Sequence, residues 1–68
     1  MGKPSRKPKT LSERMRDAVL ASGRTLYRVA KDSGVSYAAL YRFVHHRRGL
    51  GTEGMDKLYA YLEREELI

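Results

Sequence analysis

Residues 26–45 constrain the fold of this chain more than any other stretch, because two helical patterns meet there at a glycine. The apolar or small residues of the first pattern, spaced as on one face of a helix, are Leu26, Val29, Ala30 and Ser33. Gly34 then suits the left-handed backbone that often ends a helix, and Ser36 is a suitable N-cap for the next helix. The apolar side of this second helix, which we expect to end near His46, consists of Leu40, Phe43 and Val44. The stretch therefore predicts two short amphipathic helices joined by a tight turn.

A close crossing of these two helices is favoured by three residues. Ala30 is small, Gly34 follows four positions later, and Val35 places a hydrophobic side chain directly after the glycine. This combination indicates a helix-turn-helix, in which the second helix is offered to the major groove of DNA. The residues themselves therefore predict a protein that binds double-stranded DNA.

Further helices are predicted on both sides of this pair. Residues 10–13 form a T-x-x-E capping box that opens a helix ending at Gly23, and Thr25 can cap the helix that follows. The stripe of the first helix consists of Leu11, Met15, Ala18, Val19 and Ser22. Thr52 is expected to cap a last helix, whose buried stripe consists of Met55, Leu58, Tyr61 and Leu62. We therefore predict an all-α fold, a compact bundle of four helices over residues 10–68, with a short fifth turn as a variant.

Charge is distributed unevenly along a chain that is long enough for one domain only. The net charge is +6, and the absence of cysteine rules out disulfides and thiolate zinc sites. Residues 10–48 carry eight basic and three acidic residues, whereas residues 49–68 carry two basic and five acidic ones. Residues 1–9 predict a disordered basic arm, with a merely solvated tail as the alternative. The cations of this arm are Lys3, Arg6, Lys7 and Lys9. A polyanionic partner is the natural interpretation of this balance.

With these residues in place, the chain resembles the phage-repressor (Cro/XRE-type) helix-turn-helix family. The motif of that family has a small residue at its fifth place, glycine at its ninth, and hydrophobic residues at its fourth, tenth, fifteenth and eighteenth. Counted from Leu26, the matching residues of this chain are Val29, Ala30, Gly34, Val35, Leu40 and Phe43. The resemblance covers roughly residues 10–62. It implies a lambda-repressor-like bundle and a small transcriptional regulator, in particular a repressor that competes with polymerase for a promoter.

Two features of the resemblance bear on the partners. Many family members have glutamine or another polar residue at the first place of the motif, where this chain has Leu26. The resemblance therefore leaves the phosphate contact there to Thr25 or Arg28. Many members also carry a separate dimerisation or ligand domain. We expect a homodimer on DNA to use the last helix and the apolar pair Leu67–Ile68, unless that pair packs back on its own chain.

DNA contacts are predicted on the outer face of residues 36–46, opposite the apolar side. That face consists of Ser36, Tyr37, Ala38, Tyr41, Arg42 and His45. Arg42 is the best candidate for reading a base, because a guanidinium can donate two hydrogen bonds to guanine. Tyr37 can reach a base edge, a thymine methyl or a phosphate, and Ser36 with the free N–H groups of the helix start suits a phosphate. Arg47 and Arg48 are expected to hold phosphates, or otherwise to form a solvated helix end.

Other chemistry is not indicated by the sequence. His45 and His46 point about 100° apart on a helix, and no cysteine or third histidine exists to complete a metal site. No nucleophile motif, acidic pair or phosphate-binding loop is present, so we expect neither an enzyme nor a cofactor or small-molecule ligand. Tyr27, Tyr59 and Tyr61 are expected to bury their ring edges and expose their hydroxyls, rather than to stack on single-stranded bases. The alternative for Tyr27 is a contact with the DNA backbone, together with Arg28.

Two alternative functions remain open at this point. One is a protein-interaction module, such as an antitoxin-like or adaptor domain, whose exposed helix and acidic end meet a protein. The other is an RNA-binding or nucleoid-type protein that uses charge alone. No apolar run approaches the length of a membrane span, and no apolar segment follows the basic N-terminus. We therefore expect a cytoplasmic, prokaryotic or phage-encoded protein associated with the nucleoid and not with a membrane.

Overall fold

Helix α1, Leu11–Ala21, begins where the capping box predicts it. The Oγ1 of Thr10 accepts a hydrogen bond from the backbone N–H of Glu13 at 3.2 Å, and the Glu13 carboxylate accepts one from the Thr10 N–H at 2.9 Å. Two backbone donors that a helix start leaves unpaired are thereby satisfied. The predicted start of the first helix is confirmed.

The structure is a computed structural model and describes residues 10–68. The basic arm predicted for residues 1–9 lies outside the described residues. From Thr10 to Ile68 the chain forms four helices and no strand. The all-α class and the helix count are therefore confirmed for this part of the chain.

The next two helices are each capped by a hydroxyl group. Helix α2 spans Leu26–Ser33, and the Thr25 Oγ1 accepts a hydrogen bond from the Arg28 N–H at 3.1 Å. Helix α3 spans Tyr37–His45, and the Ser36 Oγ accepts one from the Ala39 N–H at 3.1 Å. Both predicted caps are confirmed. They could be predicted because each cap bonds to a residue only three positions later.

The start of helix α4, Gly51–Arg64, differs from the prediction. Thr52 lies inside the first turn, and the N-cap is Leu50, which offers no side-chain hydrogen bond. Leu50 instead packs against the core, and a Cβ added at Gly54 would lie only 2.9 Å from the Leu50 Cβ. An apolar contact over a glycine thus replaces the expected polar cap.

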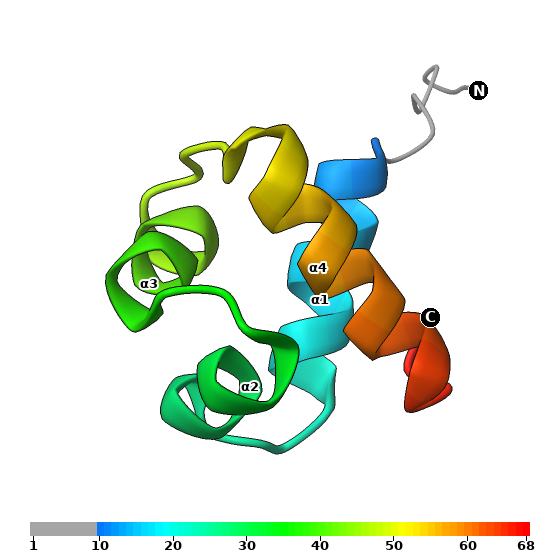
Figure 1. The fold of residues 1–68 in the computed structure, drawn as a ribbon. Coiled ribbons are helices and arrows are strands. Elements are labelled where there is room, and N and C mark those ends of the chain that lie inside the picture. The colour runs from blue at the N-terminus through cyan, green and yellow to red at the C-terminus, as the bar shows by residue number, and fades with distance from the viewer. Residues whose placement is uncertain (1–9) are drawn as a thin grey trace, which may run out of the picture.

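The four helices enclose one core. Helix α4 packs against both α1 and α2, and α2 packs against α3, which lies on the side away from the C-terminus in Figure 1. The buried side chains come from all four helices and the turn before α3: Met15, Val19, Val29, Ala30, Val35, Leu40, Phe43, Val44, Leu58, Tyr61 and Leu62. Four expected members of the stripes of the first and last helices are less buried: Leu11 is exposed in the first turn of α1, and Ala18, Ser22 and Met55 are only partly buried.

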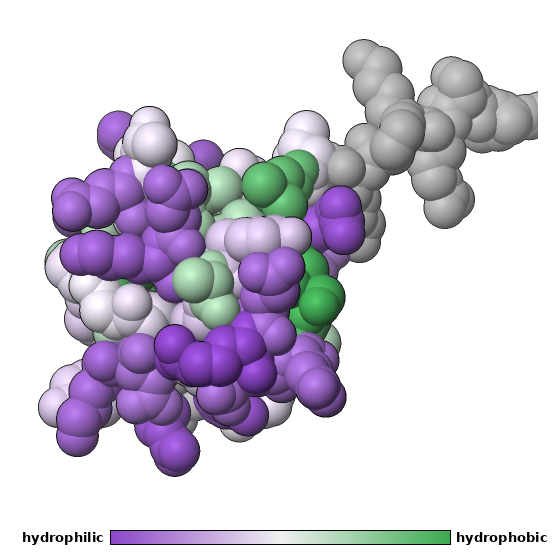
Figure 2. All heavy atoms as spheres, turned by 45° about the vertical axis from the view of Figure 1, so that its right-hand side comes forward, coloured by the Kyte–Doolittle hydropathy of each residue, from purple (hydrophilic) through white to green (hydrophobic). Residues whose placement is uncertain are grey.

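The C-terminal residues fold back on the bundle. The Leu67 N–H donates to the Leu62 carbonyl at 2.8 Å, and both Leu67 and Ile68 are half-buried against the core. Of the two expectations for this apolar pair, packing on its own chain is the one that the structure shows. Figure 2 shows the face turned toward the right-hand side of Figure 1, where hydrophobic groups are few and separated by hydrophilic ones.

Candidate nucleic-acid interface

The turn between α2 and α3 sets the direction of α3. Gly34 ends α2 with φ at 87°, in the left-handed region, and its N–H donates to the Ala30 carbonyl at 3.0 Å. Side chains other than glycine rarely adopt this conformation. Val35 follows and is buried, so the turn is held from inside before α3 starts.

Helix α3 has a buried side and an exposed side. Leu40, Phe43 and Val44 face the core, as the pattern predicts. The residues predicted for the outer face are all exposed: Ser36, Tyr37, Ala38, Tyr41, Arg42 and His45. The side of α3 that carries the candidate contacts is therefore open, while DNA contact by any of them stays a prediction.

An aromatic row runs along the exposed side of α3. The ring centroids of Tyr37 and Tyr41 lie 6.1 Å apart, and those of Tyr41 and His45 lie 4.5 Å apart. The Tyr41 ring also lies 5.8 Å from the ring of His46. Residues four apart lie above one another on a helix, so these rings form a continuous strip along α3.

The end of α3 is held by a residue that the sequence did not single out. The Arg16 Nε of α1 donates to the Phe43 carbonyl at 3.0 Å, and its guanidinium lies 5.2 Å from the centroid of the Phe43 ring. The carbonyls at a helix end lack partners within the helix, and a cation is favourable there. Arg16 thus joins α1 to α3. No local pattern reveals this contact, because the two residues lie far apart in the sequence.

The backbone turns sharply after α3. Arg47 has φ at 55°, which is the left-handed region, and the Arg48 N–H donates back to the Arg42 carbonyl at 3.2 Å. A non-glycine residue in this conformation is strained. Arg42, Arg47 and Arg48 are exposed, and none of them has an ion pair within residues 10–68.

The two residues proposed to replace the missing glutamine are engaged within α2. Thr25 caps the helix, and the Arg28 Nε donates to Asp32 Oδ2 at 2.9 Å. Both side chains are exposed and can still face a phosphate. Leu26 is partly buried against the core, which is the natural place for an apolar side chain at this position.

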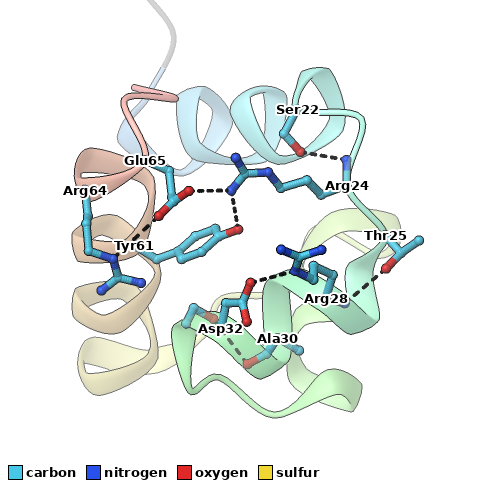
Figure 3. A network of polar contacts seen from close by, with 10 residues as sticks. Ser22, Arg24, Thr25, Arg28, Ala30, Asp32, Tyr61, Arg64 and Glu65 are labelled. Carbon is cyan, nitrogen blue, oxygen red and sulfur yellow. Dashed lines mark hydrogen bonds and ion pairs between the residues drawn. The ribbon is translucent and has the colours of Figure 1, made fainter.

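A second arginine that the sequence did not single out holds α4 to the loop between α1 and α2 (Figure 3). The Arg24 Nη1 donates to the Tyr61 hydroxyl at 2.7 Å and to the Glu65 carboxylate at 3.0 Å. The bonds to Tyr61 and then to Glu65 raise the pKa of Arg24 above its ordinary value. The contacts hold α4 against the segment that leads into α2.

The sequence predicts the same environment for the three remaining tyrosines, but the structure gives each a different one. Tyr61 is buried, and its hydroxyl accepts the bond from Arg24, so the hydroxyl is not free in water. Tyr27 is 68% exposed, so the expectation of a buried ring is wrong for this residue. Tyr59 on α4 is 37% exposed, so its ring is covered in part.

A hollow of about 390 Å³ lies between α1 and the end of α3. It is lined by charges of both signs, including Glu13, Asp17, Arg16 and Arg47. From Thr10 onward, no group of three or more histidines and acids is placed to hold a metal ion. No helix of the described part is long and apolar enough to cross a membrane.

Comparison with known proteins adds no relative to this description. No protein-family model matches the chain, and no curated protein or solved structure does so either.

Proposed function

We propose that this protein binds double-stranded DNA through a helix-turn-helix formed by α2 and α3, in a lambda-repressor-like arrangement. In this proposal the exposed side of α3 enters the major groove and the turn after α3 lies along the phosphates. The protein would act as a small sequence-specific regulator of transcription, in particular a repressor.

The observation that carries the proposal is the chemistry of the open side of α3. It combines Arg42, a donor suited to guanine, with aromatic rings and a small alanine, and α3 contains no acidic residue. Arg47 and Arg48 follow at its end, exposed and free of ion pairs within residues 10–68. Cations at this end of α3 suit the phosphates that border a groove, whose counterions are released on binding.

Sequence selection is the first test. A site selected from a random duplex library is compared with a scrambled duplex of the same length by fluorescence anisotropy at several salt concentrations. Specific binding of duplex DNA, with an affinity that falls as salt rises, supports the proposal. Sedimentation of the same complex gives its stoichiometry. A dimer on two half-sites about 34 Å apart is the expected arrangement for a motif of this type.

The second test uses Arg42→Ala with Arg14→Ala as the matched control. Arg14 is exposed on α1 and, like Arg42, has no ion pair in the described part of the chain, so both variants remove one free charge. We expect Arg42→Ala to reduce discrimination at one base pair, a guanine in the simplest case, by roughly 1–3 kcal/mol. Arg14→Ala should leave discrimination intact.

The outcomes of the two tests separate the proposed mode of binding from its alternatives. If Arg42→Ala weakens binding to every duplex equally, Arg42 contacts a phosphate and does not read a base. If it binds DNA as the unsubstituted protein does, α3 does not lie in the groove and the proposed mode is wrong. A protein that retains no duplex at low salt has another partner, and the protein-interaction alternative then leads.

A further inference from the structure

The exposed side of α3 carries two parallel rows of different chemistry. One row is the aromatic strip of Tyr37, Tyr41 and His45, spaced four residues apart. The neighbouring row pairs Ala38 with Arg42, one helical turn apart. In this second row, the Arg42 guanidinium offers hydrogen-bond donors at one end. The small Ala38 side chain leaves space beside the rings at the other end.

The rings of this strip remain largely in solvent. Tyr37 is 49% exposed and Tyr41 is 41% exposed, although both are large and apolar over most of their surface. Neither hydroxyl has a hydrogen-bond partner within residues 10–68. Because Tyr41 already lies between Tyr37 and His45, the strip is partly ordered before any partner arrives. Less side-chain freedom is then lost on binding.

The charges around the strip decide what can cover it. Arg42 is exposed on α3, Arg47 and Arg48 are exposed directly after it, and α3 has no acid, so a second copy of this same basic side would meet like charge. A polyanion is the complementary occupant. This step rests on the proposed DNA-binding function.

The edges of the rings can distinguish one feature of the major groove. The base edges there present nitrogen and oxygen groups, and the C5-methyl of thymine is their apolar group. Ring carbons gain by covering a methyl, whereas they cannot donate or accept hydrogen bonds. We propose that the Tyr37–Tyr41 strip reads thymine C5-methyl groups, so that the preferred sites place thymine opposite this row and the hydrogen-bonded base opposite Arg42.

The test replaces thymine by deoxyuridine, which lacks only the C5-methyl. Each thymine of a selected duplex is substituted in turn, and the dissociation constant is measured by anisotropy. We expect a loss of about fourfold at one or two thymines, equivalent to the ~0.8 kcal/mol of one buried methylene-sized group. Thymines outside the footprint should show no effect.

Four variants assign the effect to the strip. Tyr37→Ala and Tyr41→Ala should each weaken binding and make the protein less sensitive to uracil at one position. Tyr59→Ala removes a ring of similar exposure from α4 and should retain the full sensitivity. Tyr41→Phe keeps the ring and should retain the sensitivity too, which separates contact by the ring from a hydrogen bond of the hydroxyl. Circular dichroism verifies that each variant is folded.

The failure of this inference differs from the failure of the proposed function. If the selected duplex binds with the same affinity when every thymine is replaced by uracil, the strip does not read methyl groups, although DNA binding stands. If single-stranded DNA binds more tightly than duplex, the rings stack on bases and the inference is wrong. If no duplex is bound specifically, both the inference and the proposed function fall.

Discussion

Replacing Arg47 by glycine should stabilise the protein and weaken its binding to DNA. Arg47 directly follows the C-cap of α3 and has φ at 55°. A left-handed conformation costs a non-glycine residue roughly 1–2 kcal/mol. Glycine removes this strain but gains about 0.4–1 kcal/mol of freedom in the unfolded chain. We therefore expect the free energy of unfolding to rise by about 0.5–1 kcal/mol, which raises the Tm of a domain of this size by roughly 2–8 °C.

Glu66→Gly is the matched control for this change. Glu66 stands just beyond α4 and has φ at 59°, so its backbone carries the same kind of strain. Glycine there should raise the Tm by a similar amount. Because Glu66 is acidic and lies at the end of α4, not of α3, its replacement should leave DNA binding unchanged or slightly stronger.

Thermal unfolding followed by circular dichroism and anisotropy on a selected duplex measure the two effects. Arg47→Gly should lower the affinity for specific and scrambled duplexes alike and reduce the slope of log K against log salt by about 0.9, the value for one neutralised phosphate. The reasoning about strain is refuted if Glu66→Gly stabilises and Arg47→Gly does not. A variant that binds DNA with unchanged affinity and slope shows that Arg47 does not touch a phosphate.

Three further changes probe the core, the Arg24 contacts and the arm. Phe43→Ala removes a fully buried ring and should lower the free energy of unfolding by ~3–5 kcal/mol, so that chemical denaturation shows a largely unfolded protein. A loss below about 1 kcal/mol would contradict the assigned core. Tyr61→Phe keeps the ring but removes the hydroxyl that accepts the bond from Arg24. It should lower the free energy of unfolding by about 0.5–1.5 kcal/mol, seen as a lower Tm. An unchanged Tm would mean that this bond is not made in solution. Removal of residues 1–9 should weaken specific and random DNA binding by similar factors. The slope of log K against log salt should flatten by ~0.9 for each phosphate that the arm neutralises. An unchanged slope would identify a merely solvated tail.

The local parts of the fold were predictable because their causes are local. The hydroxyls of Thr10, Thr25 and Ser36 each accept a hydrogen bond from a residue three positions later, and such spacing is visible in any sequence. The left-handed turn at Gly34 and the division of α3 into two sides follow from equally short patterns.

The parts that were not predictable depend on contacts between distant residues. Thr52 has the chemistry of a cap, but α4 starts earlier because Leu50 docks on the core over Gly54. Nothing in the sequence around Arg16 or Arg24 marks either residue as a contact, because their partners on α3 and α4 lie far along the chain. Periodicity cannot reveal which long side chain reaches across a bundle, because that depends on how the helices cross.

The basic residues of this protein fall into two groups, and the difference bears on how it would meet DNA. Among the described residues, Arg24, Arg28, Lys57 and Arg64 each lie within 4.0 Å of an acid, whereas the arginines in and after α3 have no such neighbour. The remaining unpaired cations of this part of the chain are Arg14, Arg16 and Lys31. Exposed ion pairs contribute little to stability, so their larger consequence is on the electric field of the molecule. The pairs reduce positive charge at Arg28 on α2 and along α4, whereas the three arginines in and after α3 keep theirs. Under the proposed function, unpaired charge at α3 would favour encounters in which α3 faces the phosphates.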